Sequence, residues 1–390
     1  MSKNHIDIKH CKDLERCKQK CCELICCEPI CCESNCIDIV QSCFTTCDCL
    51  ELSFQYCKKL HKKKCGCYSK DIRPSVILLH GIGTNSDFWH CLFDKLCPVA
   101  NVYALDFPNT GKSSATCPSN LTLEYLTKIV NQFINHLCLE KVYLVGHGIG
   151  GDIALNFSVT YPDRVIRIAV SSTSPKYSPS SDWKHAINHQ IGELLERAIE
   201  TSDPIILHEI ASTYIGFIDP NNCEDKCILI KQLINNISQY QDYSELIRNI
   251  DIRNILDKIT IPVLIMSGTK DPIVPFGASL FMREKICRSA LVEFYKYGNN
   301  FPILNTNLYN KNVFNFFFVK CDPCRSFLKE ICGQNKKCEC SCDCGCGNSK
   351  PCNCNDKCKC KCKKICELDS DNDTDCNKNK CKIIIPCRYT

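Results

Sequence analysis

The sequence lacks any long apolar stretch. No run in its 390 residues reaches the roughly 18–20 apolar residues that a membrane-spanning helix needs. The chain starts with polar residues, Met1 to His5, and continues rich in cysteine and charge, without the apolar core of a signal peptide. We therefore expect an intracellular, cytoplasmic protein with no membrane span. The net charge of +5 is too small and too dispersed to predict nucleic-acid binding.

The cysteines are unevenly distributed, and their distribution divides the chain. Of 39 cysteines, fifteen precede residue 71, seventeen follow residue 320 and only seven lie between. The middle part has an ordinary globular composition and is long enough for one sizeable core. We predict an irregular cysteine-rich N-terminal tail (1–70), a globular domain (71–320) and an irregular cysteine-rich C-terminal tail (321–390).

The middle part alternates short β-branched runs with helical stretches. Between the second and third runs, apolar residues from Leu123 to Leu137 recur at helical spacing. This alternation predicts an α/β fold whose mostly parallel sheet carries helices on both faces. The expected strands are Val76–Leu79, Asn101–Leu105, Val142–Val145, Ile166–Val170, Ile261–Met266 and Leu291–Tyr295.

The strand signal disappears over residues 174–258. Apolar residues there recur at helical spacing, for example from Ile187 to Ala198 and from Ile230 to Ile237, and the residues from Asp219 to Asn222 predict a turn. A helical insertion between two strands of a parallel sheet predicts a lid over the carboxyl ends of the strands.

Five motifs resemble the α/β-hydrolase superfamily over residues 75–320, and in particular its lid-bearing esterases and lactonases. One is a strand, a glycine-rich turn and a helix around Gly146 to Gly151, which is the architecture of the nucleophile elbow, Gly-x-Ser-x-Gly. The others, in the family's order, are the oxyanion-type turn from Leu78 to Gly83, the turn from Asp106 to Ser113 with Asn109 replacing a glycine, Tyr161–Val165, and the acid-bearing turn Gly268–Pro275.

The resemblance implies a degenerate catalytic triad. It aligns Gly148 with the nucleophile, Asp271 with the acid, and Asn299 with the histidine. All ten histidines of the chain precede Asp271, so no other base follows it. Glycine has no nucleophilic atom and the asparagine amide is not basic near neutral pH, so we expect the domain to be inactive.

A ligand notch survives these losses, because it depends on main-chain atoms. The resemblance implies that Gly81, Ile82, His147 and Ile149 surround it, with the N–H groups of Ile82 and Ile149 as donors to a small carbonyl or carboxylate ligand. We interpret His147 as a packing residue and His80 as one that orients backbone. No cofactor is expected in this domain.

The C-terminal tail resembles metallothionein. Its cysteines alternate with single residues and lie among lysines, a pattern in which thiolates bridge metal ions and ammonium groups offset their charge. We predict zinc ligands here; a low-complexity tail without metal and a set of disulfides are the alternatives. The candidate ligands are Cys338, Cys340, Cys342, Cys344, Cys346, Cys352, Cys354, Cys358, Cys360, Cys362 and Cys366.

These observations predict a non-catalytic binding or scaffold module with thiol-rich tails. One alternative is an active hydrolase that uses another nucleophile, or a water activated by His147 and Asp271. The other alternative makes metal binding by the tails the function and the globular domain a carrier. The sequence identifies no protein partner.

Overall fold

The computed structural model describes residues 38–58, 73–201, 203, 205–206, 238–319 and 381–384. Within these residues, nine strands form one sheet in the order β1-β2-β4-β3-β5-β6-β7-β8-β9. The strands are β1 (Asp38–Thr45), β2 (Glu51–Lys58), β3 (Ser75–Leu79), β4 (Asn101–Leu105), β5 (Val142–His147), β6 (Val165–Ser171), β7 (Val263–Gly268), β8 (Ser289–Phe294) and β9 (Cys381–Ile384).

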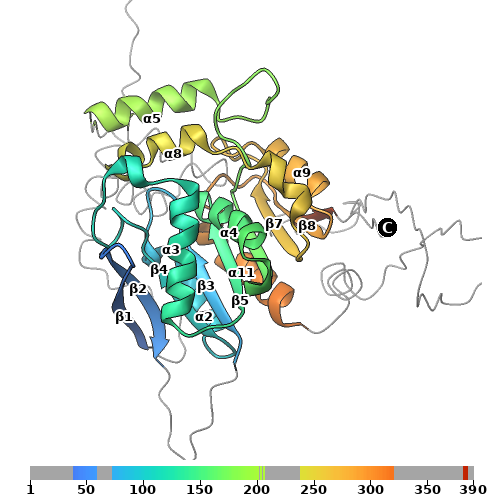
Figure 1. Ribbon diagram of the computed structural model, residues 1–390. Helices are drawn as coiled ribbons and strands as arrows, with labels where there is room; N and C mark the ends of the chain where they lie inside the picture. The colour runs from blue at the N-terminus through green and yellow to red at the C-terminus, as the bar shows by residue number, and fades with distance from the viewer. Residues whose placement is uncertain are drawn as a thin grey trace, which may run out of the picture.

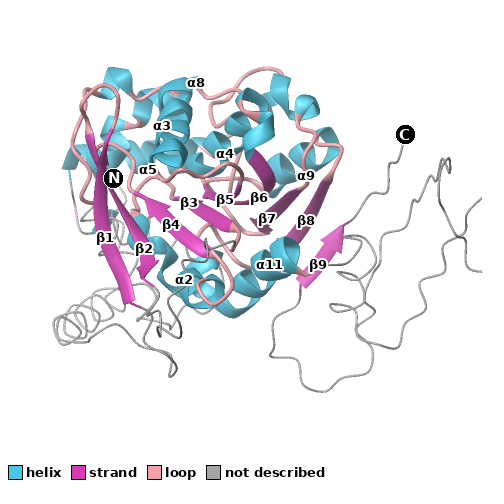
Figure 2. Cartoon of the chain, turned by 60° about the horizontal axis from the view of Figure 1, so that its bottom comes forward, coloured by secondary structure: helices cyan, strands magenta, loops and turns pink. Residues whose placement is uncertain are grey.

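The six central strands, from β4 to β8 in the sheet order, are parallel, and the antiparallel pairs lie at its two edges. Helices cover both faces of the sheet, which confirms the predicted fold class (Figures 1 and 2). The described helices are α2 (His90–Leu96), α3 (Leu123–His136), α4 (Ile149–Thr160), α5 (His189–Thr201), α8 (Ser244–Asn249), α9 (Phe276–Lys285), α10 (Phe301–Leu304) and α11 (Thr306–Phe318), with short 3-10 turns η2 (Ser86–Trp89), η3 (Pro118–Asn120), η4 (Pro162–Arg164) and η5 (Arg253–Lys258).

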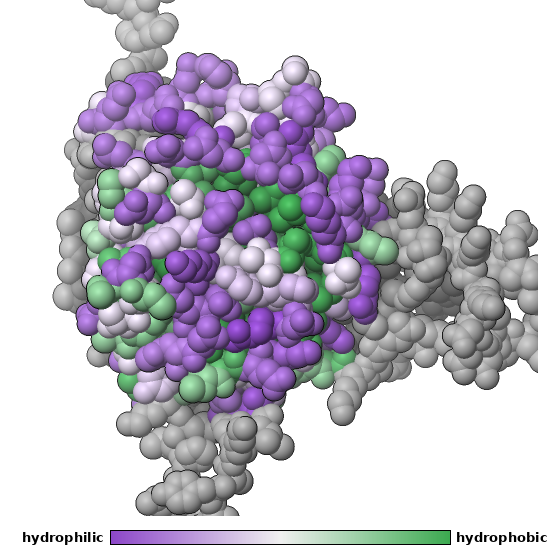
Figure 3. Space-filling view, viewed as in Figure 1, coloured by the Kyte–Doolittle hydropathy of each residue, from purple (hydrophilic) through white to green (hydrophobic). Residues whose placement is uncertain are grey.

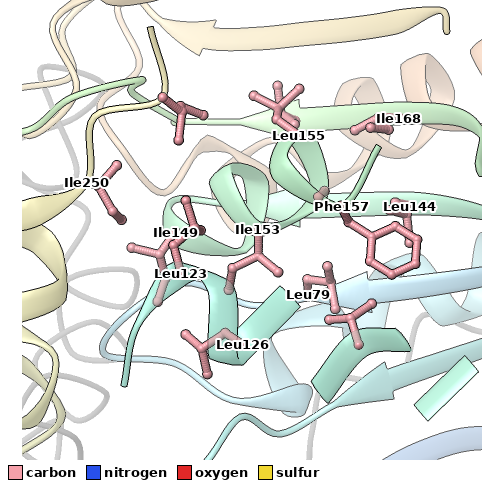
Figure 4. Packing of buried hydrophobic residues seen from close by; sticks show 14 of the residues in the cluster. Leu79, Leu123, Leu126, Leu144, Ile149, Ile153, Leu155, Phe157, Ile168 and Ile250 are labelled. Carbon is pink, nitrogen blue, oxygen red and sulfur yellow. The ribbon is translucent and has the colours of Figure 1, made fainter. Parts of the chain in front are cut away.

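Alternation along each buried strand divides the core between the two faces. In β3, Ile77 and Leu79 pack in a cluster with α3, α4 and α9, whereas Val76 and Leu78 pack in a second cluster with α2 and α11. Figure 4 shows the first cluster, with side chains of α3 and α4 meeting the strand residues Leu79 and Leu144. The core therefore fixes β3 and β5 from both sides, and the turns that follow these two strands carry the candidate site.

The sheet extends into the predicted N-terminal tail, so the boundary at residue 70 is wrong for residues 38–58. The β1–β2 hairpin pairs with β4, and Phe44, Leu52 and Phe54 are buried against α3, with ring centroids 5.1 and 5.0 Å from Phe133 for the two phenylalanines. The dense cysteines around the hairpin hid its alternating pattern. β9 likewise lies within the predicted C-terminal tail.

The disulfide between Cys57 and Cys97 joins the hairpin to the end of α2, and its Cα atoms are 6.2 Å apart. Disulfides are rare in intracellular proteins, so this pairing departs from what the predicted intracellular location implies. Six further cysteines are free and exposed, namely Cys43, Cys47, Cys49, Cys117, Cys138 and Cys287, and the side chain of Cys91 is exposed as well.

The predicted lid is described in part. Its helices α5 and α8 lie together at one end of the sheet (Figure 1), and a bridge between Lys176 and Asp251 ties the first part of the insertion to the last. The second predicted helical stretch, from Ile230 to Ile237, and the predicted turn at Asp219 lie outside the described residues.

The surface of the described domain is mostly polar. Figure 3 shows hydrophilic residues over most of one face, with hydrophobic residues visible in a band between them. The exposed large hydrophobic side chains of this part are Val99, Ile205, Leu280 and Tyr295, on separate elements. No helix within the described ranges is long and apolar enough to cross a lipid bilayer.

Candidate functional site

The chain turns sharply at Gly148, between β5 and α4. Gly148 has φ 53° and ψ −125°, and α4 begins at the next residue, Ile149. A residue with a Cβ adopts such a conformation at a cost of about 1–3 kcal/mol, whereas glycine adopts it almost freely. Residue 148 therefore occupies the point at which a nucleophile elbow presents its reactive side chain.

The glycines around the elbow differ in the space that each leaves for a Cβ atom. An ideal Cβ on Gly146 would lie 2.4 Å from the carbonyl oxygen of Gly150, and one on Gly150 would lie 2.1 Å from the carbonyl oxygen of Leu79. A Cβ on Gly148 would meet nothing closer than the Cα of Gly81, at 3.6 Å. The flanking glycines are required by close backbone packing, but the central position has room for a side chain.

The predicted notch residues come together around this turn. The turn after β3 is held by two hydrogen bonds to the carbonyl oxygen of Gly81, from Nδ1 of His80 and Oγ1 of Thr84, each 2.8 Å long. Among the described residues, no loop or cap hydrogen bond uses the N–H of Ile82 or of Ile149. Both main-chain groups therefore keep the donor capacity that a carbonyl or carboxylate ligand requires.

His80 joins the turns that follow β3 and β4. Its side chain is buried, and Nε2 accepts a hydrogen bond of 3.1 Å from the N–H of Phe107 and contacts the hydroxyl of Thr110 at 3.0 Å. Burial lowers the pKa of His80, which favours the neutral ring that these contacts need. These contacts agree with the interpretation of His80 as a residue that orients backbone.

Asn299 lies directly on the surviving acid. Its Nδ2 donates to Oδ2 and Oδ1 of Asp271 at 3.0 and 3.3 Å, and Oδ1 of Asp271 also accepts from the N–H groups of Ile273 and Val274. Burial raises the pKa of Asp271 to about 6, although these hydrogen bonds and one from Ser172 lower it. The acid therefore contacts an amide where a triad acid contacts an imidazole, and that amide has no proton to exchange with a substrate.

His147 faces the same amide from the other side. Its ring stacks on Phe88 with centroids 4.6 Å apart and places Nδ1 3.2 Å from Oγ of Ser171. The side chain of Asn299 lies close enough to the ring to favour its protonated form. Burial lowers the pKa of His147 to about 4, so the ring is neutral at pH 7 and a weak base.

The sequence analysis missed the serines at the end of β6. Ser171 contacts His147, and Ser172, which has φ 46°, donates from Oγ to the carbonyl oxygen of Asn299 at 2.9 Å. The hydroxyl run from Ser171 to Ser174 in a buried strand end is the signal that could have identified them. Both hydroxyls are fully buried and hydrogen-bonded. Ser172 holds the main chain of Asn299 and Ser171 contacts the ring of His147, so neither presents a nucleophile.

The predicted zinc ligands, Cys338 to Cys366, all lie outside the described residues. Within the part of the chain that the structure describes, no three or more histidine, cysteine, aspartate or glutamate residues are grouped in a way that could hold a metal ion.

The parallel sheet, the elbow and the turn that bears Asp271 define the class of this domain: it has the α/β-hydrolase fold. A family model described as the alpha/beta hydrolase fold matches residues 74–197.

The similar proteins of known sequence or structure include esterases and a lactonase. The pimeloyl-(acyl-carrier protein) methyl ester esterase of Salmonella heidelberg is 24% identical over 207 residues, which are 51% of this chain and 77% of that one. The esterase EaEST of Exiguobacterium antarcticum superposes with a TM-score of 0.60 and 19% identity, over 70% of this chain and 98% of its own. An enol-lactonase of Burkholderia xenovorans gives a TM-score of 0.56 and 19% identity, over 68% and 96%.

Proposed function

We propose that this protein is a non-catalytic binding module that accepts a small carbonyl compound, of the ester or lactone class, in the notch beside Gly148. The relatives named above are esterases and a lactonase, which supports that ligand class. The free N–H groups of Ile82 and Ile149 support a ligand carbonyl oxygen as the group that is held.

One observation supports the proposed lack of catalytic activity. The side-chain amide of Asn299 occupies the position beside Asp271 from which a catalytic base would act. With no side chain at residue 148, neither the attack nor the proton transfer of acyl transfer has a group to perform it. Loss of a triad nucleophile or base costs about 10⁶ in turnover in the protease for which it was measured.

Hydrolysis of p-nitrophenyl acetate tests the inactivity. The wild-type protein is expected to match the background rate. Gly148→Ser with Asn299→His is expected to exceed it, because the nucleophile returns at a position that has room for a side chain and the base returns beside Asp271. The single variant Gly148→Ser is the matched control and should stay near background. Wild-type hydrolysis that falls when His147 or Asp271 is replaced would contradict the proposal.

Binding is tested separately with phenyl acetate, by saturation-transfer NMR. Ile149→Pro removes one donor of the notch, and proline is tolerated at the first residue of a helix. Ile149→Val keeps the N–H and is the matched control, since its side chain is of similar size. We expect binding to wild type and to Ile149→Val, and weaker binding to Ile149→Pro. Equal affinities for all three proteins would exclude the notch as the binding site.

One observation favours a second candidate, a hydrolase that activates water. The side chain of Asn299 lies between His147 and Asp271 and donates to the carboxylate, so an amide stands between the acid and a histidine. The lowered pKa of His147 makes it a poor base and places this candidate second. Loss of any measured activity in His147→Asn at pH 7 would support it, and an unchanged rate would exclude it.

Zinc binding by the eleven C-terminal cysteines remains a separate proposal. It rests on their spacing among lysines. Protein purified under reducing conditions should contain zinc in stoichiometric amounts, measured by atomic emission, and deletion of residues 321–390 should remove it. Absence of zinc from the full chain would overturn this proposal.

A further inference from the structure

Residues 238–243 lie across the turns that follow β3 and β4. Oε1 of Gln239 accepts a hydrogen bond of 3.0 Å from the N–H of Gly83, and the hydroxyl of Tyr243 donates to the carbonyl oxygen of Pro108 at 2.7 Å. The side chains of Gln239 and Tyr243 are only 3% and 1% exposed. The segment is therefore fastened to both turns by buried hydrogen bonds.

Tyr240 brings this segment next to the notch. Its ring lies so close to Gly83, which has φ 76°, that an ideal Cβ on that glycine would be 2.5 Å from the tyrosine hydroxyl oxygen. Gly83 directly follows Ile82, whose N–H is one of the two donors of the notch. Residues 238–243, which we call the cover, thus lie at the edge of the proposed ligand site.

Asn109 adds a contact that the usual residue of its motif would not provide. The motif has glycine at this position, and Asn109 has the positive φ, 61°, that glycine would supply. Its Nδ2 donates to Oδ2 of Asp242 at 2.9 Å and to the carbonyl oxygen of Thr116 at 3.0 Å. The carboxylate acceptor makes the bond to the cover charge-assisted, and such bonds are stronger than neutral ones.

We propose that the hydrogen bond between Asn109 and Asp242 is a latch that holds the cover closed over the notch. The inference rests on the proposed function, because the latch matters to a ligand only if the notch binds one. On this proposal only molecules whose cover is open bind the ligand, so its apparent Kd is the intrinsic Kd divided by the open fraction. Breaking the latch raises the open fraction and lowers the apparent Kd.

Three single variants isolate the latch. Asn109→Gly removes the donor while keeping the positive φ, and Asp242→Ala removes the acceptor. Asp242→Asn is the matched control, because its Oδ1 still accepts from Asn109. In hydrogen exchange measured by mass spectrometry, peptides covering residues 238–249 should exchange about tenfold faster in the first two variants. The third variant keeps a weaker, neutral bond and should exchange at a rate between those of the wild type and Asp242→Ala. Unchanged exchange in both Asn109→Gly and Asp242→Ala overturns the latch.

The double variant tests whether the two residues act as one pair. Asn109→Gly with Asp242→Ala should exchange no faster than the more affected single variant, because the same bond is already lost. Additive acceleration overturns the pairing, since it assigns the two effects to separate contacts.

Titration with phenyl acetate then separates the latch from the proposed function. The apparent Kd should fall about tenfold in Asn109→Gly and Asp242→Ala and by a smaller factor in Asp242→Asn, which keeps a neutral bond. Faster exchange with an unchanged Kd overturns the latch as a gate. If Asn109→Gly and Asp242→Ala exchange faster but neither they nor the wild type bind phenyl acetate, the latch is supported as a structural contact and the proposed binding function is overturned.

Discussion

At the candidate site the backbone has the geometry of a nucleophile elbow, but residue 148 has no side chain that could react. Gly148 retains the positive φ of the turn while contributing no side-chain atom, and the glycines on either side retain the packing that brings α4 against β3 and β5. The three glycines of the elbow therefore differ in what a substitution does.

Stability of alanine variants distinguishes these glycines. Gly148→Ala should fold and lose about 1–3 kcal/mol, because only the backbone conformation is unfavourable. Gly150→Ala should lose about 4 kcal/mol or more, because its Cβ would overlap the carbonyl oxygen of Leu79. Urea unfolding measures both, and equal losses in the two variants would contradict the assignment of room at residue 148.

His147 and Asp271 give opposite pH dependences of stability. The lowered pKa of His147 means that the unfolded chain gains its proton first, so stability is lost as pH falls from about 6.5 to about 4. The raised pKa of Asp271 means that stability is lost as pH rises from about 3.8 to about 6. Between pH 4 and 6 the two contributions largely cancel in the wild-type protein.

Replacing either residue should expose the pH dependence of stability that the other contributes. Relative to wild type, the unfolding free energy of His147→Asn should fall by about 3 kcal/mol as pH rises from 4 to 6.5, and that of Asp271→Asn should rise by a similar amount as pH rises from 4 to 6. Urea unfolding in a series of buffers measures both slopes. Differences from wild type that stay constant across this range would show that the two groups titrate normally.

At the scale of elements, the β1–β2 hairpin is part of the core. Leu52→Ala should cost about 2–5 kcal/mol, because Leu52 is fully buried within the cluster against α3. Cys43→Ser is the control on the same hairpin and should change stability by less than about 0.5 kcal/mol, because Cys43 is exposed. Thermal or urea unfolding measures both, and a neutral Leu52→Ala would contradict a hairpin docked on the sheet.

The elements show what the sequence could and could not predict. The strands from β3 to β8 follow from apolar runs and lie within two residues of their predicted bounds, because each run is buried on both faces. The hairpin escaped prediction because cysteine-rich composition surrounds its short alternating strands.

The candidate site likewise has features that the sequence predicts and features that it does not. The positions of Gly148, Asp271 and Asn299 follow from motif spacing along the chain. The contacts of His147 with Asn299 and of Asn109 with Asp242 join residues more than 130 positions apart, and spacing carries no information about such pairs.

At the scale of the whole molecule, two of the described cysteines form a disulfide and seven others are exposed. Native protein treated with iodoacetamide should be labelled at the exposed thiols, and at Cys57 and Cys97 only after reduction. Cys117 should react fastest among them, because hydrogen bonds from the hydroxyl and backbone of Ser119 lower its pKa and thiolate is the reactive form. Peptide mass spectrometry over a time course measures the order; labelling of Cys57 or Cys97 without reductant would contradict the disulfide.

The strands β1 and β9 each carry a cysteine, Cys43 and Cys381 respectively. These strands are the opposite edges of one sheet (Figure 2), and nine strands spaced about 4.8 Å apart separate the edges by roughly 38 Å. A zinc ion binds thiolates at about 2.3 Å. Cys43 in β1 and Cys381 in β9 therefore cannot bind one zinc ion together within a single copy, and the sheet acts as a rigid spacer between these two cysteines.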